Sequence, residues 1–145
     1  MRATIAIVLL ALLPAAVRAQ DKQVIQPSGA LGLPFSSAVR VGNMLYLSGQ
    51  VGVKPGTREV VSGGVGPETQ QALENIKRVL ESAGSSMDRV VKCTVFLKDI
   101  ADYAAMNQVY ATFFPKDPPA RSAMAGSGLA LGARVEIECI AVAGS

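Results

Sequence analysis

The alternation of apolar and polar positions predicts a β-hairpin between residues 38 and 49. Two apolar runs, 38–41 and 44–47, flank the dipeptide Gly42-Asn43. Both residues tolerate a positive φ, which two-residue hairpin turns require. We therefore expect a strand, a tight turn and a second strand here. The preceding segment, 21–34, is polar and rich in Gly and Pro, which is typical of a loose or edge-pairing arm.

Two longer segments show helical periodicity. Between Pro67 and Ala83, apolar residues recur on one face of a helix, at Ala72, Leu73, Ile76, Val79 and Leu80. Pro67 suits the first turn of this helix and Gly84 suits its end. Residues 99–114 repeat the pattern, and the prolines at 115, 118 and 119 end it. One face of this second predicted helix is made of Tyr103, Met106, Tyr110 and Phe113.

The remaining apolar segments have strand patterns. Residues 88–98 alternate and put Val91, Cys93, Val95 and Leu97 on one face. Residues 121–124 predict a short extended piece, 126–132 a glycine-rich loop and 134–142 a final strand rich in β-branched residues. The order β-β-α-β-α-β, with crossovers of helix length, predicts one sheet covered by helices, an α+β or α/β sandwich.

Composition restricts the chemistry of any active site. The chain has 145 residues, half of them apolar, with no His and no Trp and with only two Cys. This size suits one globular domain. Without His, nucleophile–His pairs are excluded, as are zinc sites built on imidazole or on clustered thiolates. Catalysis would have to use carboxylates, Arg, Lys, hydroxyls or backbone groups.

The first nineteen residues have the pattern of a signal peptide. Arg2 supplies the positive end, residues 5–13 are an unbroken apolar run, and Val17 and Ala19 are suitable small residues before a cleavage site. An uncleaved anchor is the alternative, although the apolar stretch is shorter than the ~20 residues of a bilayer span. We therefore expect cleavage near Ala19/Gln20, a periplasmic or secreted protein, an arm at 20–33 and a domain at 34–145.

Charge and cysteine placement exclude further classes. Of 14 basic residues, Arg2 and Arg18 lie in the predicted signal peptide, which leaves 12 basic against 11 acidic groups. A balance near zero, without clustered Lys and Arg, does not favour binding of nucleic acid or of a membrane beyond the signal peptide. Cys93 and Cys139 both fall inside strand patterns, so we expect buried free thiols rather than the disulfide that export would permit.

Three features are candidates for a functional site. Glu136 and Glu138 share one face of the last strand, either as a solvent-facing pair or because another subunit covers that face and one glutamate lines a site. Arg121 follows Pro118-Pro119-Ala120 in apolar surroundings, either as a surface residue or as a ligand for a carboxylate. Gly49 allows a close approach of a ligand or marks a plain bulge.

Several of these segments together closely resemble the RidA (YjgF-like) family. The segments are 42–50, 91–99, 106–114, 119–122 and 135–142, in that order along the chain. The resemblance implies the chorismate-mutase-like α+β fold, a mixed β-sheet packed on one face by two helices. It also implies a homotrimer with its sheets facing inward and with sites at the subunit interfaces.

The resemblance further implies a deaminase that hydrolyses 2-iminobutanoate and 2-iminopropanoate, formed from reactive enamines, to 2-oxoacids and ammonia without a cofactor. In this family pattern Arg121 binds the substrate carboxylate, and Glu136 positions or activates the attacking water. Gly49 and Asn107 line the site, together with Phe35 and Ala123. The last two depart from the pattern, which usually has Tyr and often has Cys there. A non-catalytic trimer that binds small carboxylates at its interfaces is therefore the alternative.

Overall fold

Seven strands form one mixed sheet in the computed structural model, which describes residues 21–28 and 32–144. The predicted signal peptide and part of the arm lie outside these residues. The strand order is β1-β2-β3-β7-β5-β6, with β4 paired to β7, and every pairing is antiparallel except that of β5 with β6. The strands are β1 Lys22–Ile25, β2 Ala38–Val41, β3 Met44–Leu47, β4 Gln50–Val51, β5 Val90–Leu97, β6 Ala120–Ala125 and β7 Val135–Val142.

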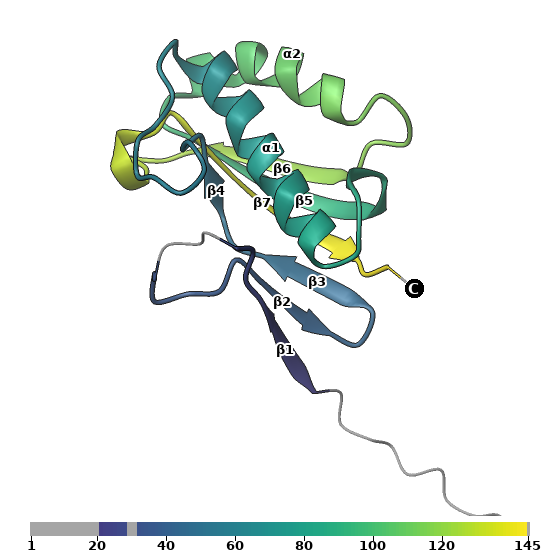
Figure 1. Cartoon of the computed structure of the whole chain (residues 1–145). Helices are drawn as coiled ribbons and strands as arrows, with labels where there is room; N and C mark the ends of the chain where they lie inside the picture. Colours follow the sequence, from purple (N-terminus) through teal and green to yellow (C-terminus); the bar gives the residue numbers. More distant parts are fainter. Residues whose placement is uncertain (1–20, 29–31, 145) are drawn as a thin grey trace, which may run out of the picture.

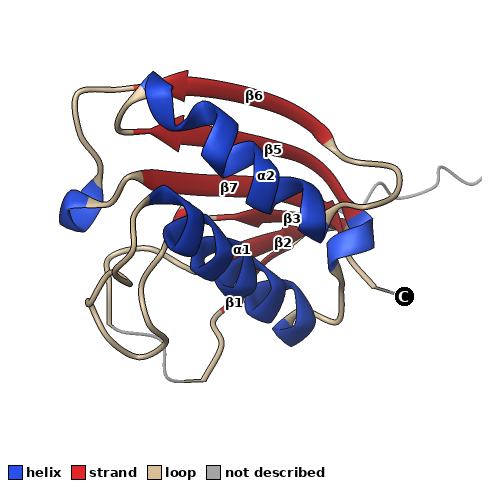
Figure 2. Cartoon of the chain, turned by 90° about the horizontal axis from the view of Figure 1, so that it is seen from above, coloured by secondary structure: helices blue, strands red, loops and turns tan. Residues whose placement is uncertain are grey.

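Two helices cover one face of this sheet (Figures 1 and 2). They are α1, Val65–Ser82, and α2, Tyr103–Phe113, and three short 3-10 turns accompany them, η1 Met87–Arg89, η2 Ile100–Asp102 and η3 Ala130–Gly132. The core lies between helices and sheet, with fully buried side chains from both layers such as Leu45, Leu73, Ile76, Leu80, Leu97 and Ile137. The predicted α+β fold, a mixed sheet with two helices on one face, is confirmed.

The predicted hairpin and first helix are confirmed, with small shifts at their ends. Gly42 has a φ of +58°, as its turn requires. Helix α1 begins at Val65, two residues before Pro67. Proline fits in the first turn because the N–H groups of that turn have no acceptor within the helix, so its missing N–H costs no hydrogen bond. The last residue of α1 is Ser82, and Gly84, just beyond the cap, has a φ of +70°; there the Ser85 N–H donates to the Leu80 carbonyl at 2.9 Å.

A bulge in β5 corrects the predicted faces of that strand. The pairing with β7 shifts between Val90 and Lys92, so that Val90 is buried and Val91 is 43% exposed. The prediction that Val91 shares the core face is therefore wrong. The extra residue of the bulge reverses the alternation of buried and exposed side chains on the N-terminal side of the bulge. Cys93 and the later residues of β5 keep their predicted faces.

The same bulge explains a disulfide that the strand pattern did not predict. Cys93 and Cys139 lie opposite each other in β5 and β7 and are joined by a disulfide. Without the bulge, the pairing of Val90 with Ala141 would continue so as to place Cys93 opposite Glu138. The prediction of two free thiols is wrong because a periodic pattern shows which residues are buried, but not which residue of a distant strand each one faces.

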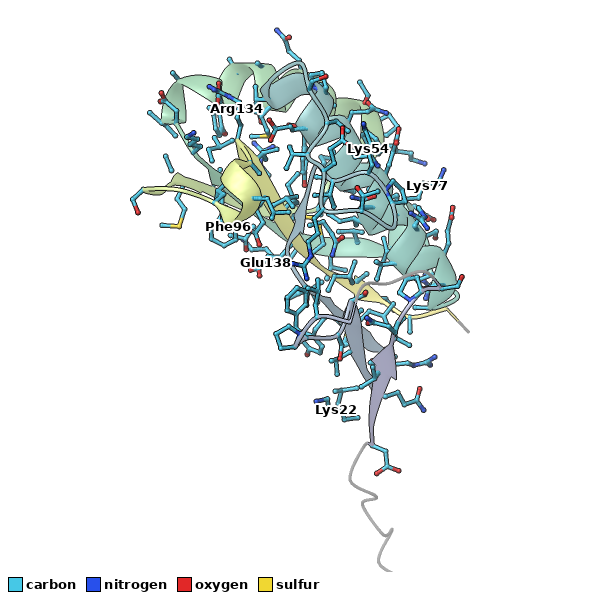
Figure 3. All side chains as sticks on the ribbon, turned by 60° about the vertical axis from the view of Figure 1, so that its left-hand side comes forward. Lys22, Lys54, Lys77, Phe96, Arg134 and Glu138 are labelled. Atoms are coloured by element: carbon cyan, nitrogen blue, oxygen red, sulfur yellow. A yellow bond between two sulfur atoms is a disulfide. The ribbon has the colours of Figure 1, made fainter. Side chains whose placement is uncertain are left out.

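The face of the sheet that points away from the helices carries partly exposed apolar side chains. Tyr46 on β3 is 48% exposed and Met124 on β6 is 56% exposed, and Met124 is opposite Phe96 in register. Figure 3 shows Phe96 and Glu138 on this side, away from α1 and α2. We call this surface the open face. Within the described residues, no helix is long and apolar enough to span a membrane.

Candidate functional site

Arg121 lies on β6, at the edge of the sheet, and is held against α2. It is paired in register with Cys93, whose side chain is in the core, so the Arg121 side chain also points to the helix side. Its guanidinium carbon is 4.5 Å from the ring centroid of Tyr110 and 5.6 Å from that of Tyr103. Its Nη2 donates a hydrogen bond of 3.1 Å to the Tyr103 hydroxyl. These contacts are attractive for a cation over aromatic rings.

The two tyrosines differ in their surroundings. Burial raises the pKa of Tyr110 to about 12, and its hydroxyl has no hydrogen-bond partner among the described residues. Side-chain hydrogen bonds from Asn107 and Arg121 lower the pKa of Tyr103. Ala123, two residues beyond Arg121 on the same side of β6, packs against the core. We call this group, Arg121, Tyr103, Tyr110, Asn107 and Ala123, the arginine half-site.

Glu136 lies on β7 and projects from the other side of the sheet from its buried neighbours Val135 and Ile137. Its carboxylate lies directly against Gly49, where a Cβ atom would overlap Oε1. Burial, and then the negative charge of Glu138, raise the pKa of Glu136 above its ordinary value. A carboxylate with a raised pKa is a better proton acceptor near neutral pH than an exposed one.

A cavity of about 460 Å³ opens beside Glu136. Phe35 and Leu131 form apolar parts of its wall, and both side chains are more than half exposed. The wall includes residues from the arm, the segment before β2, β4 with the residue before it, the loop after β4, α1 and η3, such as Leu33, Phe35, Gly49, Gln50, Val53, Asn75 and Leu131. We call Glu136, Gly49 and Phe35, with this cavity, the glutamate half-site.

The structure therefore brings the predicted site residues together in two groups rather than one. Cys139 faces the core and lies an odd number of residues from Glu136, so Glu136 and Arg121 are on opposite sides of the sheet. No residue of β6 or α2 contributes to the described wall of the cavity at Glu136. Within one chain, a small substrate cannot touch both Arg121 and Glu136.

A second arginine, Arg134, already has an acidic partner. The guanidinium of Arg134, at the start of β7, donates two hydrogen bonds of 2.9 Å to the Asp102 carboxylate, and its backbone N–H donates to Glu68. The hydrogen bonds to Asp102, and then its negative charge, raise the pKa of Arg134, and they connect η2 to the residue before β7. Arg134 is thus a structural cation, whereas Arg121 has no carboxylate partner among the described residues. No group of three potential metal ligands occurs in the described part of the chain.

Sequence reasoning missed the aromatic support of Arg121. Tyr103 and Tyr110 were assigned to the apolar face of the second helix, and Tyr110 is indeed buried. The available signal was their spacing of seven residues with Asn107 between them, which gathers two hydroxyls and an amide on one side of the helix. That signal did not show that the arginine of a separate strand would pack there.

Comparisons with known proteins agree with this architecture. Residues 27–143 match the family described as endoribonuclease L-PSP. A RutC family protein from Pyrococcus horikoshii is 47% identical over 108 residues, which cover 74% of this chain and 86% of that protein. The human 2-iminobutanoate/2-iminopropanoate deaminase is 44% identical over 116 residues, 80% of this chain and 84% of the human protein.

A solved structure extends the likeness to three dimensions. The crystal structure of RidA from the Antarctic bacterium Psychrobacter matches with a TM-score of 0.78 at 40% identity, over 83% of this chain and 98% of that one. The match of the family over most of the chain and the identity of the relatives lead to one assignment. The chain belongs to the endoribonuclease L-PSP family, which is the RidA (YjgF-like) family.

Proposed function

We propose that this protein is an imine deaminase whose active site forms between subunits of a homotrimer. The observation that carries the proposal is the placement of Arg121 and Glu136 on opposite sides of one sheet, each in a half-site that lacks the other's function. A second copy of the chain can supply the missing half. The deaminases among the relatives support the choice of reaction.

The open face supports the assembly. It carries half-exposed apolar side chains from β3 and β6 beside the acidic Glu138 of β7. Large apolar groups that stay exposed in one chain mark surfaces that other molecules cover. Packing of open faces against one another around a threefold axis would bury these groups and bring the arginine half-site of one subunit to the glutamate half-site of its neighbour.

The chemistry follows from the two half-sites. Arg121, whose guanidinium carbon lies over the ring of Tyr110, binds the carboxylate of a 2-iminoacid through two parallel hydrogen bonds. Glu136 accepts a proton from a water molecule as its oxygen attacks the imine carbon. Glu136 passes this proton to the nitrogen, which gives a carbinolamine. The C–N bond breaks as the carbinolamine hydroxyl proton also moves to the nitrogen, so that the imine and one water give a 2-oxoacid and ammonia. The imine carbon is already electrophilic, so orientation and one carboxylate are enough.

Mixed assemblies test the proposal directly. Arg121→Ala and Glu136→Gln chains with different affinity tags are co-expressed, and assemblies carrying both tags are purified. In a ring of three, every mixed trimer holds one site with its Arg and its Glu both intact. We expect each variant alone to lose at least ~100-fold in kcat/KM for 2-iminopropanoate, because each lacks a group that orients or activates the reactants.

The mixed trimers should recover about one third of wild-type activity, measured as 2-oxoacid and ammonia release. Doubly tagged assemblies of Arg121→Ala with itself are the control and should stay inactive. Inactive mixed trimers of the correct mass would show that the two residues do not act across an interface.

A non-catalytic carboxylate-binding trimer is the second candidate, favoured by Phe35. This residue lines the glutamate half-site without the hydroxyl that deaminases of the family usually have there. In that case 2-oxoacids would raise the melting temperature of the wild-type protein in a saturable manner, and no iminoacid would be turned over.

We also propose that the protein is exported. The Cys93–Cys139 disulfide supports this location, since disulfides persist in oxidising compartments and are rare in the cytosol. The intact mass of the exported protein tests it. We expect a chain that begins at Gln20 and contains no free thiol.

A further inference from the structure

We propose that the hydroxyl of Tyr103 is a substrate-binding group that donates its proton to the carboxylate held by Arg121. This inference rests on the proposed function, in which Arg121 binds a carboxylate. It adds a third hydrogen-bond donor to that site and assigns a role to a residue that the sequence pattern placed on the apolar face of a helix.

The hydrogen bonds of the Tyr103 hydroxyl leave its proton available. A phenolic hydroxyl has one proton to donate and lone pairs to accept. Here the oxygen accepts from Arg121 Nη2 at 3.1 Å. The described residues contain no hydrogen bond in which this hydroxyl is the donor, and the side chain is 39% exposed. The proton is thus free to meet a ligand on Arg121.

Tyr110 provides an internal comparison. It lies on the same helix and its ring is closer to the guanidinium, but it is only 5% exposed and its hydroxyl is buried. Tyr110 therefore supports Arg121 through its ring alone. Tyr103 is the tyrosine whose hydroxyl contacts the guanidinium, as the acceptor of a hydrogen bond from Arg121 Nη2.

The backbone before Tyr103 is anchored at two points, which holds the hydroxyl in place. The carboxylate of Asp99 accepts from the Ala101 N–H at 2.9 Å and so fixes turn η2. Asp102, directly after Ala101, is held by two hydrogen bonds from Arg134, the residue before β7. Tyr103 follows directly as the first residue of α2. A donor that is already oriented loses little conformational entropy when the ligand binds.

The consequence is a preference for ligands with a carboxylate. A hydrogen bond from a hydroxyl to a charged oxygen is stronger than one between neutral groups. Removing it with Tyr103→Phe should weaken binding of 2-oxobutanoate about 10-fold and raise KM for 2-iminobutanoate to a similar extent. kcat should change little, because the carboxylate has the same charge in the substrate and in the transition state.

The experiment measures affinity and kinetics separately on the assembled mature protein. Isothermal titration with 2-oxobutanoate gives Kd without requiring turnover, so it tests Tyr103 even if the deaminase proposal fails. Thr112→Val, which removes an exposed hydroxyl from the same helix that donates to the Val109 carbonyl, is the matched control and should bind as the wild type does. Wild-type affinity in Tyr103→Phe, or a loss confined to kcat, would overturn the inference.

The pH dependence of Kd separates donation to the ligand from mere support of Arg121. Around Tyr103 lie Arg121 from β6, Tyr110 from α2, and Asp102 paired with Arg134. Asn107 and Arg121 lower the pKa of Tyr103 from its ordinary value, whereas burial raises the pKa of Tyr110 to about 12. If the proton is donated, affinity falls as the pH rises through the pKa of Tyr103, and Tyr103→Phe abolishes that fall. An alkaline profile that is the same in both proteins contradicts donation.

Discussion

At the scale of single residues, the position of the Glu136 carboxylate depends on an absent side chain. Gly49 leaves the space that Oε1 occupies, and its backbone does not have a positive φ. Its importance therefore comes from the close approach of Glu136 and not from backbone strain. This gives the candidate glycine of the sequence pattern a physical role, the positioning of the carboxylate that we propose to be catalytic.

We expect Gly49→Ala to lower kcat for 2-iminopropanoate by about 100-fold, since displacement of a reacting group by about 1 Å has effects of this size. Gly126→Ala is the control, because a Cβ there meets no atom within 4 Å and needs no positive φ. Kinetics and thermal melting of both variants are the measurements. A fully active Gly49→Ala would mean that Glu136 works equally well from a different position.

At the scale of elements, the sheet is joined covalently at its centre. The disulfide connects β5, which pairs with the strand that carries Arg121, to β7, which carries Glu136. The two cysteines are 46 residues apart, so the bond closes a loop that contains η2, α2 and β6. A link across a loop of this length stabilises the fold mainly by restricting the unfolded chain.

We expect the double variant Cys93→Ala/Cys139→Ala to lose about 2–4 kcal/mol in free energy of unfolding, measured by urea denaturation. A reducing agent should lower the midpoint of the wild type in the same direction and leave the double variant unchanged, which serves as the control. Equal midpoints for wild type and double variant would contradict a stabilising role for the bond.

At the scale of the whole molecule, the open face and the divided site point to the same requirement for a partner. Met124 and Phe96 lie side by side on that face, and Met124 is more than half exposed in the single chain. Burial of such side chains is the main source of stability in oligomer interfaces. The assembly and the activity should therefore be lost together.

We expect Met124→Glu to shift the protein from a trimer to smaller species in light scattering and to abolish 2-iminopropanoate hydrolysis, because a charge at the interface would be buried without a partner. Ala111→Glu adds the same charge on the exposed side of α2 and should remain trimeric and active. A Met124→Glu trimer with wild-type activity would place the interface elsewhere.

Predictions from sequence succeeded where short-range periodicity decides the structure. The hairpin at Gly42-Asn43 and the helix that ends before Gly84 depend on neighbours within a few residues. They failed at Val91 and at the two cysteines, where one extra residue in β5 changes the partner of every residue beyond it. The predicted site residues lie in the two half-sites, but the sequence did not predict that Arg121 packs on the rings of Tyr103 and Tyr110.

By itself, the sequence determined the order of the elements, the face of each regular helix and strand, and the absence of imidazole chemistry. These properties follow from residue types and from the periods of helix and strand. Only the tertiary structure decided that Cys93 meets Cys139, that Arg121 lies on tyrosines of α2, and that Glu136 faces the other way. The reason is physical: contacts between distant segments depend on strand register, and register depends on the packing of the whole sheet.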